Sequence, residues 1–321
     1  MVFSKPIFLF GFLPIVLLLY YIAPRKFKNF VLLFMSLIFY AWGEPKLLLL
    51  MVFTIFVDYT AGLLINKYSN KPVTSKIIFV ATLVINLALL GIFKYANFVI
   101  DSINSVVGGK FDLLEISLPI GISFYTFQAL SYVIDVYKKV VPVEKNLLNF
   151  TTYVVLFPQL IAGPIVQYKT VANELSKRQE TVGLFSEGIW RFAVGLAKKV
   201  IIANQIGAIW TEIHSTPELL TAGKAWIGAL AFTFQIYFDF SGYSDMAIGL
   251  GKMFGFNFLE NFNYPFIANS ITDFWRRWHI SLSSFLKDYV YIPLGGNRLG
   301  ALKQIRNIFV VWFLTGFWHG A

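Results

Sequence analysis

Long uncharged apolar runs are the dominant feature of this sequence. Residues 6–23, 116–134 and 147–166 contain no Asp, Glu, Lys or Arg. Each run is close to the ~20 residues that a membrane-crossing helix needs. Of the 321 residues, 57% are hydrophobic and only 14% are charged, whereas charged residues make up about a quarter of an ordinary soluble domain. The sequence therefore predicts an all-α, multi-pass transmembrane helical protein.

Composition excludes several other classes of protein. The chain has 34 Phe, 16 Tyr and 8 Trp but no Cys, which excludes a disordered chain, a disulfide scaffold, a thiol nucleophile and a zinc–thiolate site. The formal net charge of +10 is compatible with nucleic-acid binding. In a membrane protein, however, basic residues gather in cytoplasmic loops and at lipid headgroups. We therefore expect contact with membrane lipid and no nucleic-acid partner.

Basic residues predict how the first half is threaded through the membrane. Six candidate spans cover residues 6–23, 30–42, 47–66, 77–100, 116–137 and 147–168, of which 30–42 is short enough to be tilted or half-crossing. Every second connection is rich in basic residues. For a protein of the cytoplasmic (inner) membrane, the positive-inside rule places these connections in the cytoplasm and the N-terminus outside it. They contain Arg25, Lys26 and Lys28, then Lys67, Lys71 and Lys76, then Lys138, Lys139 and Lys145.

The second half has a different character. Charged side chains interrupt its apolar sequence, and polar groups at membrane depth normally face a protein interior or a wet cavity. We therefore interpret the chain as one membrane domain, with residues 1–168 as an N-terminal span bundle and 169–321 as the half that carries the function. Its scattered glycines predict close helix packing or non-helical backbone beside a cavity. The charged residues are Arg191, Lys198, Lys199, Asp239, Asp245 and Lys252.

Two of the three histidines are candidate functional residues. His214 lies in a polar connection and is interpreted as a solvated histidine. His279 belongs to the segment 270–289, whose apolar residues recur at three- and four-residue steps and predict an interfacial amphipathic helix. Ser270 is its predicted N-cap, and Asp273 is placed to pair with Arg277. His279 lies at the edge of the apolar stripe, where a structural and a functional role are both open.

His319 ends an uncharged apolar run, residues 308–318. An ionisable group in that position is a functional-site hypothesis, and a neutral imidazole takes up a proton near pH 7. The histidines are far apart in the sequence and form no His-Glu-x-x-His pattern, so we expect no metal site. No nucleotide-binding loop is recognised around Gly249 and Gly251. The last apolar run extends only ~21 Å as a helix, which predicts a chain truncated at its C-terminus.

Several motifs together resemble the membrane-bound O-acyltransferase family. They extend over essentially the whole chain, and the combination is more specific than any one of them. The resemblance implies an all-helical multi-pass fold with tilted and re-entrant helices around a central funnel, continued by further helices after residue 321. The motifs are YFDFSGYSDMAIG at 237–249, FWRRWHISLS at 274–283, LGGNR at 294–298, WHGA at 318–321, FKYAN at 93–97, LPIGISFY at 118–125 and IAGP at 161–164.

The same resemblance implies an activity and the residues for it. His319 matches the family's proposed catalytic histidine and His279 its second motif histidine. The family moves an acyl group from a cytoplasmic thioester donor, such as acetyl-CoA, to an acceptor at or across the membrane. In the branch that acetylates polysaccharides, an extracytoplasmic O-acetyltransferase partner completes the transfer to the polymer. The donor is a substrate, and no bound cofactor is expected.

Charge and position predict supporting roles for other residues in this half. Arg276 and Arg277 are candidates for the phosphates of the donor, and Trp275 and Trp278 are grouped with them as substrate-binding residues. Asp239 and Asp245 join this group as carboxylates that support the site through ion pairs. Three rival functions remain open: a transporter or channel for an acetyl donor, a scaffold for the exported acetyltransferase, and D-alanyl transfer to teichoic acid.

Overall fold

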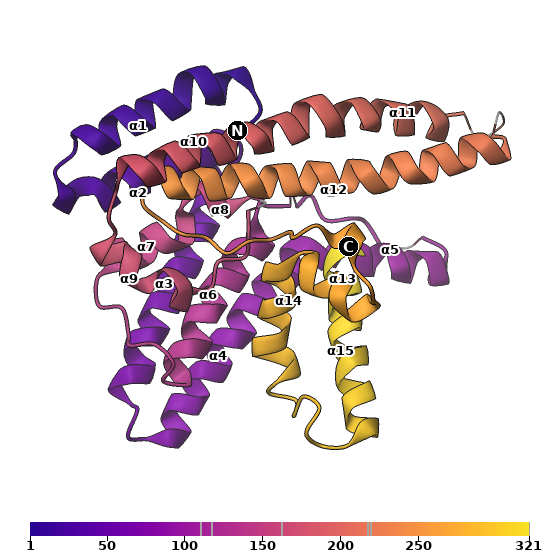
Figure 1. Cartoon of the computed structure of the whole chain (residues 1–321). Helices are drawn as coiled ribbons and strands as arrows, with labels where there is room; N and C mark the ends of the chain where they lie inside the picture. Colours follow the sequence, from indigo (N-terminus) through magenta and orange to yellow (C-terminus); the bar gives the residue numbers. More distant parts are fainter. Residues whose placement is uncertain (110, 117, 162, 217, 219, 321) are drawn as a thin grey trace. The chain divides into compact units, whose positions relative to one another are not determined.

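The computed structural model describes residues 1–109, 111–116, 118–161, 163–216, 218 and 220–320 (Figure 1). Regular structure within these residues is entirely helical, and three of the helices are long and apolar enough to cross a membrane. The prediction of an all-α membrane protein is confirmed. The chain divides into two compact units, each assembled from separate stretches of sequence. Unit 1 comprises Met1–Phe39, Leu156–Val166 and Thr170–Ser281, and unit 2 comprises Tyr40–Val155, Gln167–Lys169 and Leu282–Ala321.

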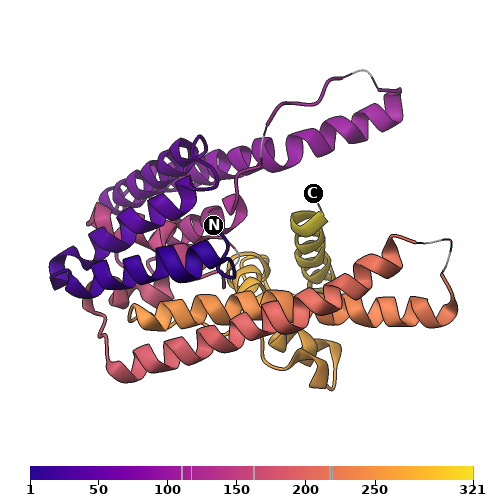
Figure 2. The ribbon, with the colours of Figure 1, turned by 90° about the horizontal axis from the view of Figure 1, so that it is seen from above.

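Unit 1 is built around two long helices. A π-helical turn at Lys198–Ala203 joins α10 to α11, which gives one continuous helix of 33 residues, Val182–His214, beside the 32-residue α12 (Figures 1 and 2). Helices wholly or mostly in this unit are α1 (Leu13–Ile22), α2 (Lys28–Ala41), α8 (Phe157–Leu160), α9 (Tyr168–Lys177), α10 (Val182–Ala197), α11 (Asn204–His214), α12 (Ala222–Met253) and α13 (Ile271–Arg277).

Glycines allow α10 and α12 to pack backbone against backbone. A Cβ atom added to Gly195 would lie 2.5 Å from the carbonyl oxygen of Gly242, and one added to Gly249 would lie 2.6 Å from that of Gly188. The two contacts run in opposite directions along the chain, so the helices are antiparallel. Small residues at such contacts are the usual means of close helix packing in membranes. Of the two alternatives predicted for the scattered glycines, close helix packing is the one found at Gly242 and Gly249.

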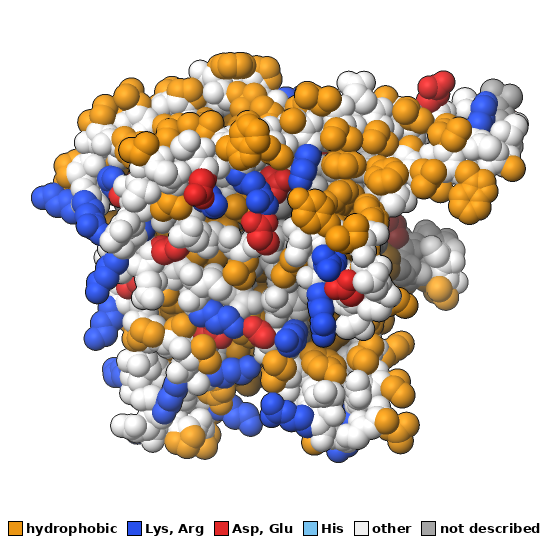
Figure 3. Space-filling model, viewed as in Figure 1, with side chains coloured by type: hydrophobic (Ala, Val, Ile, Leu, Met, Phe, Trp, Pro, Cys, Tyr) orange, Lys and Arg blue, Asp and Glu red, His pale blue; other side chains and the backbone are white. Residues whose placement is uncertain are grey.

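The outer face of α12 is suited to lipid. Trp226, Ile227, Leu230 and Phe234 are all exposed large hydrophobic side chains. Figure 3 shows apolar side chains along this long helix. A contiguous apolar surface of this kind marks a membrane or partner contact.

A buried polar cluster attaches α1 to the connection between α9 and α10. The Tyr20 hydroxyl donates to Glu180 Oε1 at 2.6 Å, and Arg178 Nε donates to the Tyr20 oxygen at 2.7 Å. Lys28 Nζ lies 3.2 Å from Glu180 Oε1. Burial by itself raises the pKa of Glu180, but the hydrogen bonds from Tyr20 and Lys28 and the positive charges of Lys28 and Arg178 outweigh it and lower that pKa.

Unit 2 contains the other two candidate spans. They are α3, and the continuous 36-residue helix Pro72–Val107 formed by α4, a π-helical turn at Gly91–Tyr95, and α5. Helices α3, α4 and α6 pack on one another, and a Cβ on Gly62 of α3 would lie 2.6 Å from the Tyr132 hydroxyl of α6. The helices are α3 (Leu48–Lys67), α4 (Pro72–Leu90), α5 (Ala96–Val107), α6 (Ile122–Tyr137), α7 (Leu147–Val155), α14 (Ile280–Leu286) and α15 (Ala301–Gly320).

The observed helices differ from the predicted spans in several places. The predictions for 47–66 and 77–100 match α3 and the 36-residue helix, whereas 6–23 and 116–137 contain shorter helices, Ile7–Ile22 and Ile122–Tyr137. The prediction of one span over 147–168 is wrong. That run forms the short helices α7 and α8 and then, at 163–167, non-helical chain, because Pro158 cannot continue a helix from α7. Its side chains from Phe150 to Leu160 are almost all buried, so the run is apolar because it is core.

Candidate active site

His279 lies at a sharp break between two short helices. Helix α13 ends at Arg277, Trp278 is extended, and His279 has a left-handed φ of 44° before α14 begins at Ile280. The predicted continuous amphipathic helix over 270–289 is therefore wrong at this point. Its predicted start is confirmed, because the Ser270 hydroxyl accepts a hydrogen bond from Asp273 N at 3.0 Å.

Asn261 holds the break together from a distant part of the sequence. Its Oδ1 accepts hydrogen bonds from Ser281 N at 3.2 Å, Ser281 Oγ at 2.9 Å and His279 Nδ1 at 3.1 Å. Its Nδ2 donates to Ser244 Oγ at 3.0 Å. Asn261 is completely buried and His279 is 3% exposed. His279 is therefore inside the protein and not at the edge of an exposed apolar stripe.

These contacts fix the tautomer of His279. Ser281 N is a backbone donor, so the Asn261 atom facing it must be the carbonyl oxygen. A carbonyl oxygen only accepts, and His279 Nδ1 must therefore carry the proton. In the neutral ring the lone pair is then on Nε2. The ring is packed edge-on against Phe240, with 4.7 Å between ring centroids.

His319 is exposed at the end of α15 and has the same tautomer. Its Nδ1 lies 2.8 Å from the carbonyl oxygen of Thr315, one turn earlier. Since that oxygen only accepts, Nδ1 donates and the lone pair of the neutral ring is on Nε2. Helix α15 starts at Ala301, earlier than the apolar run from 308 predicted, and its 20 residues extend about 30 Å.

Sequence reasoning did not single out Lys94, which contacts the residue next to His319. The Lys94 ammonium donates to the Trp318 carbonyl oxygen and lies 5.4 Å from the centre of the Trp318 ring. Tyr95 stacks on Phe317 with 4.3 Å between ring centroids. Both residues come from the π-helical turn of the 36-residue helix. A lysine within an otherwise apolar run is the signal that should have identified it.

An apolar cavity of about 510 Å³ lies beside α15 in unit 2. Its volume is typical of small-molecule sites, which are mostly apolar with a few polar groups. Thr315 and Tyr289 are among the lining residues that carry a polar group. The α15 residues that line it are Leu314, Thr315, Phe317 and Trp318, and the rest of the wall includes Leu83, Leu87, Tyr95, Phe127, Leu130, Phe285 and Tyr289.

The residues around His279 differ in the contacts that their side chains make. Arg277 pairs with Asp273 at 3.0 Å, as predicted, and donates to the carbonyl oxygen of Asn263 at 3.3 Å. Arg276 is exposed. Trp278 packs against Phe262, and Trp275 packs edge-on against Phe274, with ring centroids 5.1 Å and 5.3 Å apart.

The predicted carboxylates Asp239 and Asp245 pair with basic residues of the neighbouring long helix. Asp245 is 7% exposed at its side chain and lies 2.7 Å from both Lys198 Nζ and Arg191 Nη2. Asp239 lies 2.5 Å from Lys199 Nζ. Buried charges in a membrane protein normally pair in this way. These contacts give both aspartates a structural role in unit 1.

The two candidate histidines are described in different units, His279 in unit 1 and His319 in unit 2. His214 is exposed at the end of α11, where its ring stacks on Trp210 with 4.9 Å between centroids. Among the described residues, no three His, Asp or Glu side chains gather as metal ligands would.

Comparison with known proteins decides the family. Residues 138–321 match the profile of the membrane-bound O-acyltransferase family. The chain belongs to this family. The resemblance seen in the motifs is confirmed.

The named relatives are longer than this chain. It is 48% identical over 325 residues to the probable alginate O-acetylase of Pseudomonas aeruginosa, spanning all of this chain and 62% of that protein. It is 38% identical to the peptidoglycan O-acetyltransferase of Helicobacter pylori, of which it spans 67%. The teichoic acid D-alanyltransferase of Bacillus subtilis is 30% identical over 63% of this chain. The chain therefore spans about 62% of the length of its alginate-type relative.

Proposed function

We propose that this chain carries the two histidines of an inner-membrane, multi-pass O-acetyltransferase, with His319 as general base. The observation that carries the proposal is the hydrogen bond from His319 Nδ1 to the Thr315 carbonyl oxygen. It leaves the proton-accepting lone pair on Nε2 and holds the ring in one orientation. A catalytic base needs this arrangement of a fixed ring with one basic nitrogen.

The reaction transfers an acetyl group from a cytoplasmic thioester, such as acetyl-CoA, to a hydroxyl. His319 Nε2 takes the hydroxyl proton while the oxygen attacks the thioester carbonyl carbon. The carbon–sulfur bond then breaks, and the imidazolium returns the proton to the departing thiolate. A positioned base contributes about 10² to 10⁴ in rate, or ~3 to 5 kcal/mol of the barrier.

The surroundings of His319 support this chemistry. The Thr315 carbonyl oxygen keeps its hydrogen bond with Nδ1–H when the ring becomes positive. The apolar cavity beside Trp318 lies next to the end of α15 that carries His319. Lys94 donates a hydrogen bond to the carbonyl oxygen of Trp318, the residue before His319. It is therefore a positioning residue for the end of α15.

His279 and the residues beside it are assigned to the donor. His279 is held in a rigid, buried position, and Arg276 offers an exposed guanidinium to the donor's phosphates. Trp275 and Trp278 supply apolar surface next to that cation. Arg277 is the weaker candidate of the two arginines, since it already pairs with Asp273.

The acceptor is assigned from the named relatives. We propose that the acetyl group passes to an extracytoplasmic, alginate-like polysaccharide with the help of an exported O-acetyltransferase. Five alginate-type relatives are 46–48% identical to this chain, whereas the teichoic acid relative is 30% identical. This difference favours O-acetylation over D-alanyl transfer.

The test is thioester cleavage by the purified full-length protein without its exported partner. We expect release of free thiol from acetyl-CoA together with transfer to an added hydroxyl acceptor. A transporter or scaffold would leave the thioester intact, so a complete absence of thiol release at saturating donor would contradict the proposal.

A further inference from the structure

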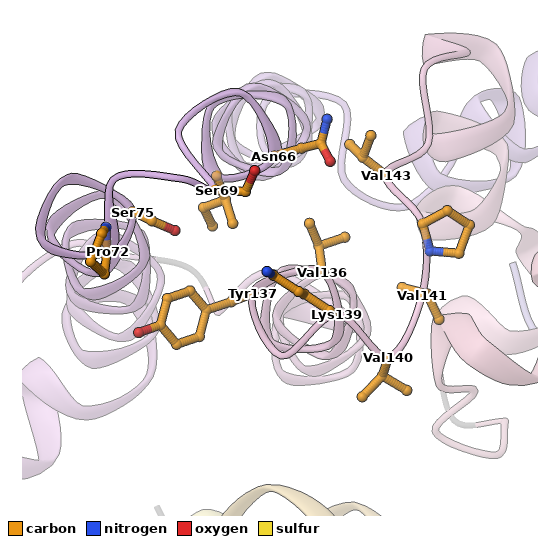
Figure 4. Close-up of a pocket in the computed structure, with 12 residues that line it drawn as sticks. Asn66, Ser69, Pro72, Ser75, Val136, Tyr137, Lys139, Val140, Val141 and Val143 are labelled. Carbon is orange, nitrogen blue, oxygen red and sulfur yellow. The ribbon is translucent and has the colours of Figure 1, made fainter.

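A second cavity, of about 690 Å³, opens in unit 2 far along the chain from both histidines (Figure 4). It lies where α3 ends, α4 begins and α6 ends. Its volume is within the range of small-molecule sites. Its wall combines apolar side chains with hydroxyl, amide and ammonium groups. The lining residues are Ile65, Asn66, Ser69, Pro72, Ser75, Val136, Tyr137, Lys139, Val140, Val141, Pro142 and Val143.

The cavity lies at the adjoining ends of two candidate membrane-spanning helices. Helix α3 and the 36-residue helix that starts at Pro72 are both candidate spans, and the cavity lies at the turn that joins them. The end of a membrane-spanning helix is at headgroup level. The N-terminus of α4 contributes partial positive charge to the same place.

Lys139 enters the cavity from a backbone position that usually belongs to glycine. Its φ is 58°. Lys139 N donates to the Val136 oxygen at 3.0 Å and Val140 N to the Asp135 oxygen at 2.8 Å, which is the hydrogen-bond pattern that terminates a helix with a left-handed residue. A lysine has an energetic cost there that a glycine does not. Figure 4 shows its side chain extending across the end of α6.

Ser75 adds a hydroxyl to the same wall. The residue is 6% exposed and lies in the first turn of α4. Figure 4 shows its hydroxyl directed into the space between α4 and α6. No hydrogen bond joins this hydroxyl to another group in the described part of the chain, which leaves it available to a ligand. A ligand oxygen would satisfy it.

The charge around the cavity is strongly positive. The acidic residues of these segments, Asp135 and Glu144, already accept hydrogen bonds from the hydroxyls of Tyr289 and Tyr168. Figure 3 shows Lys and Arg side chains at the lower left, over α3 and α4. The lysines of the two connections are Lys67, Lys71, Lys76, Lys138, Lys139 and Lys145.

We propose that this cavity binds the phosphate headgroup of an anionic phospholipid from the cytoplasmic leaflet. Lys139 and Ser75 hold the phosphate oxygens, and the valines and Ile65 contact the glycerol and the upper acyl chains. The predicted cytoplasmic location of both connections places the cavity at the leaflet whose anionic lipids attract basic clusters. The site is separate from acetyl transfer and stands or falls independently of it.

The test measures lipid retained by the purified full-length protein in native mass spectrometry, with dioleoylphosphatidylglycerol and dioleoylphosphatidylcholine as probes. We expect preferential retention of phosphatidylglycerol. Lys139→Gly should weaken it about tenfold, as expected for one lost charge-assisted hydrogen bond, with no loss of thermal stability because glycine suits the left-handed position. Ser75→Ala should weaken it less.

Lys145→Gly is the matched control, because it removes a lysine from the same connection that does not line the cavity. We expect it to change retention by less than about twofold, since an isolated surface charge contributes little. Equal losses in the Lys139 and Lys145 variants would show diffuse attraction and overturn the site. Displacement of the lipid by inorganic phosphate would assign the cavity to a soluble anion and overturn the lipid assignment.

Discussion

Replacement of Asn261 by Ala should be among the most destabilising single changes in unit 1. The substitution removes the acceptor of three hydrogen bonds, from His279 Nδ1, Ser281 N and Ser281 Oγ, and the donor of a fourth, to Ser244 Oγ. All of these groups are buried. Leaving one buried group unsatisfied costs about 1–3 kcal/mol, and the serine hydroxyls can turn to other acceptors.

His279 Nδ1–H and Ser281 N–H cannot rotate to another acceptor. We therefore expect the free energy of unfolding to fall by about 3–5 kcal/mol. The left-handed backbone at His279 costs about 1–2 kcal/mol. It should relax once the hydrogen bonds to Asn261 are lost. The assay is thermal unfolding of the full-length protein in detergent, where the midpoint should fall by on the order of 10 °C.

Asn263→Ala is the matched control for this change. Asn263 is an exposed asparagine two residues away, and its contacts with Arg277 are made by its backbone N and O atoms. If both variants unfold at the same temperature, Asn261 does not hold the break and the account of His279 is wrong.

Three further predictions concern donor binding, pH and topology. Arg276→Gln should weaken acetyl-CoA binding about tenfold or more with little change in thermal stability. Arg277→Gln should mainly lower thermal stability. A binding titration in which Arg277→Gln weakens acetyl-CoA binding and Arg276→Gln does not would contradict the assignment. The pKa of Glu180 is lowered in the folded protein. Its charge therefore stabilises the fold above the ordinary pKa of 4.5, and this stabilisation is lost as the pH falls through the lower pKa of the folded state. The unfolding midpoint of the Glu180→Gln variant should lack this decrease at acid pH. Single cysteines within 67–76 and 138–145 should resist an impermeant thiol reagent in intact cells, and strong labelling of both would reverse the topology.

Local sequence patterns predicted the class of the protein but not the break at His279. The apolar three- and four-residue spacing continues from α13 into α14, so periodicity alone indicates one helix. The break depends on Asn261, which is 18 residues away from His279 and satisfies the groups that a helix would have paired. Histidine is among the non-glycine residues that tolerate a left-handed backbone, but that preference is too weak to locate a break.

Non-local pairing also explains the long helix that the sequence did not predict. Residues 182–214 form a candidate span, although Arg191 and Lys198 made the run look unsuitable. Both cations pair with Asp245 of α12, and a paired charge facing another helix is far less costly in a membrane than an isolated one. By contrast, the start of α13 and the Asp273–Arg277 pair were predictable, because both depend on residues one turn apart.

The central claim is that His319 acts as a base, and the most direct measurement is polymer acetylation by His319→Gln in the full-length protein at matched membrane abundance. Gln keeps a hydrogen-bonding side chain of similar size but cannot take up the proton, so acetylation should fall by about 10²-fold or more. His214→Gln, which changes an exposed histidine stacked on Trp210, should acetylate like the wild type. Near-normal acetylation by His319→Gln would contradict the general-base role and favour a transporter.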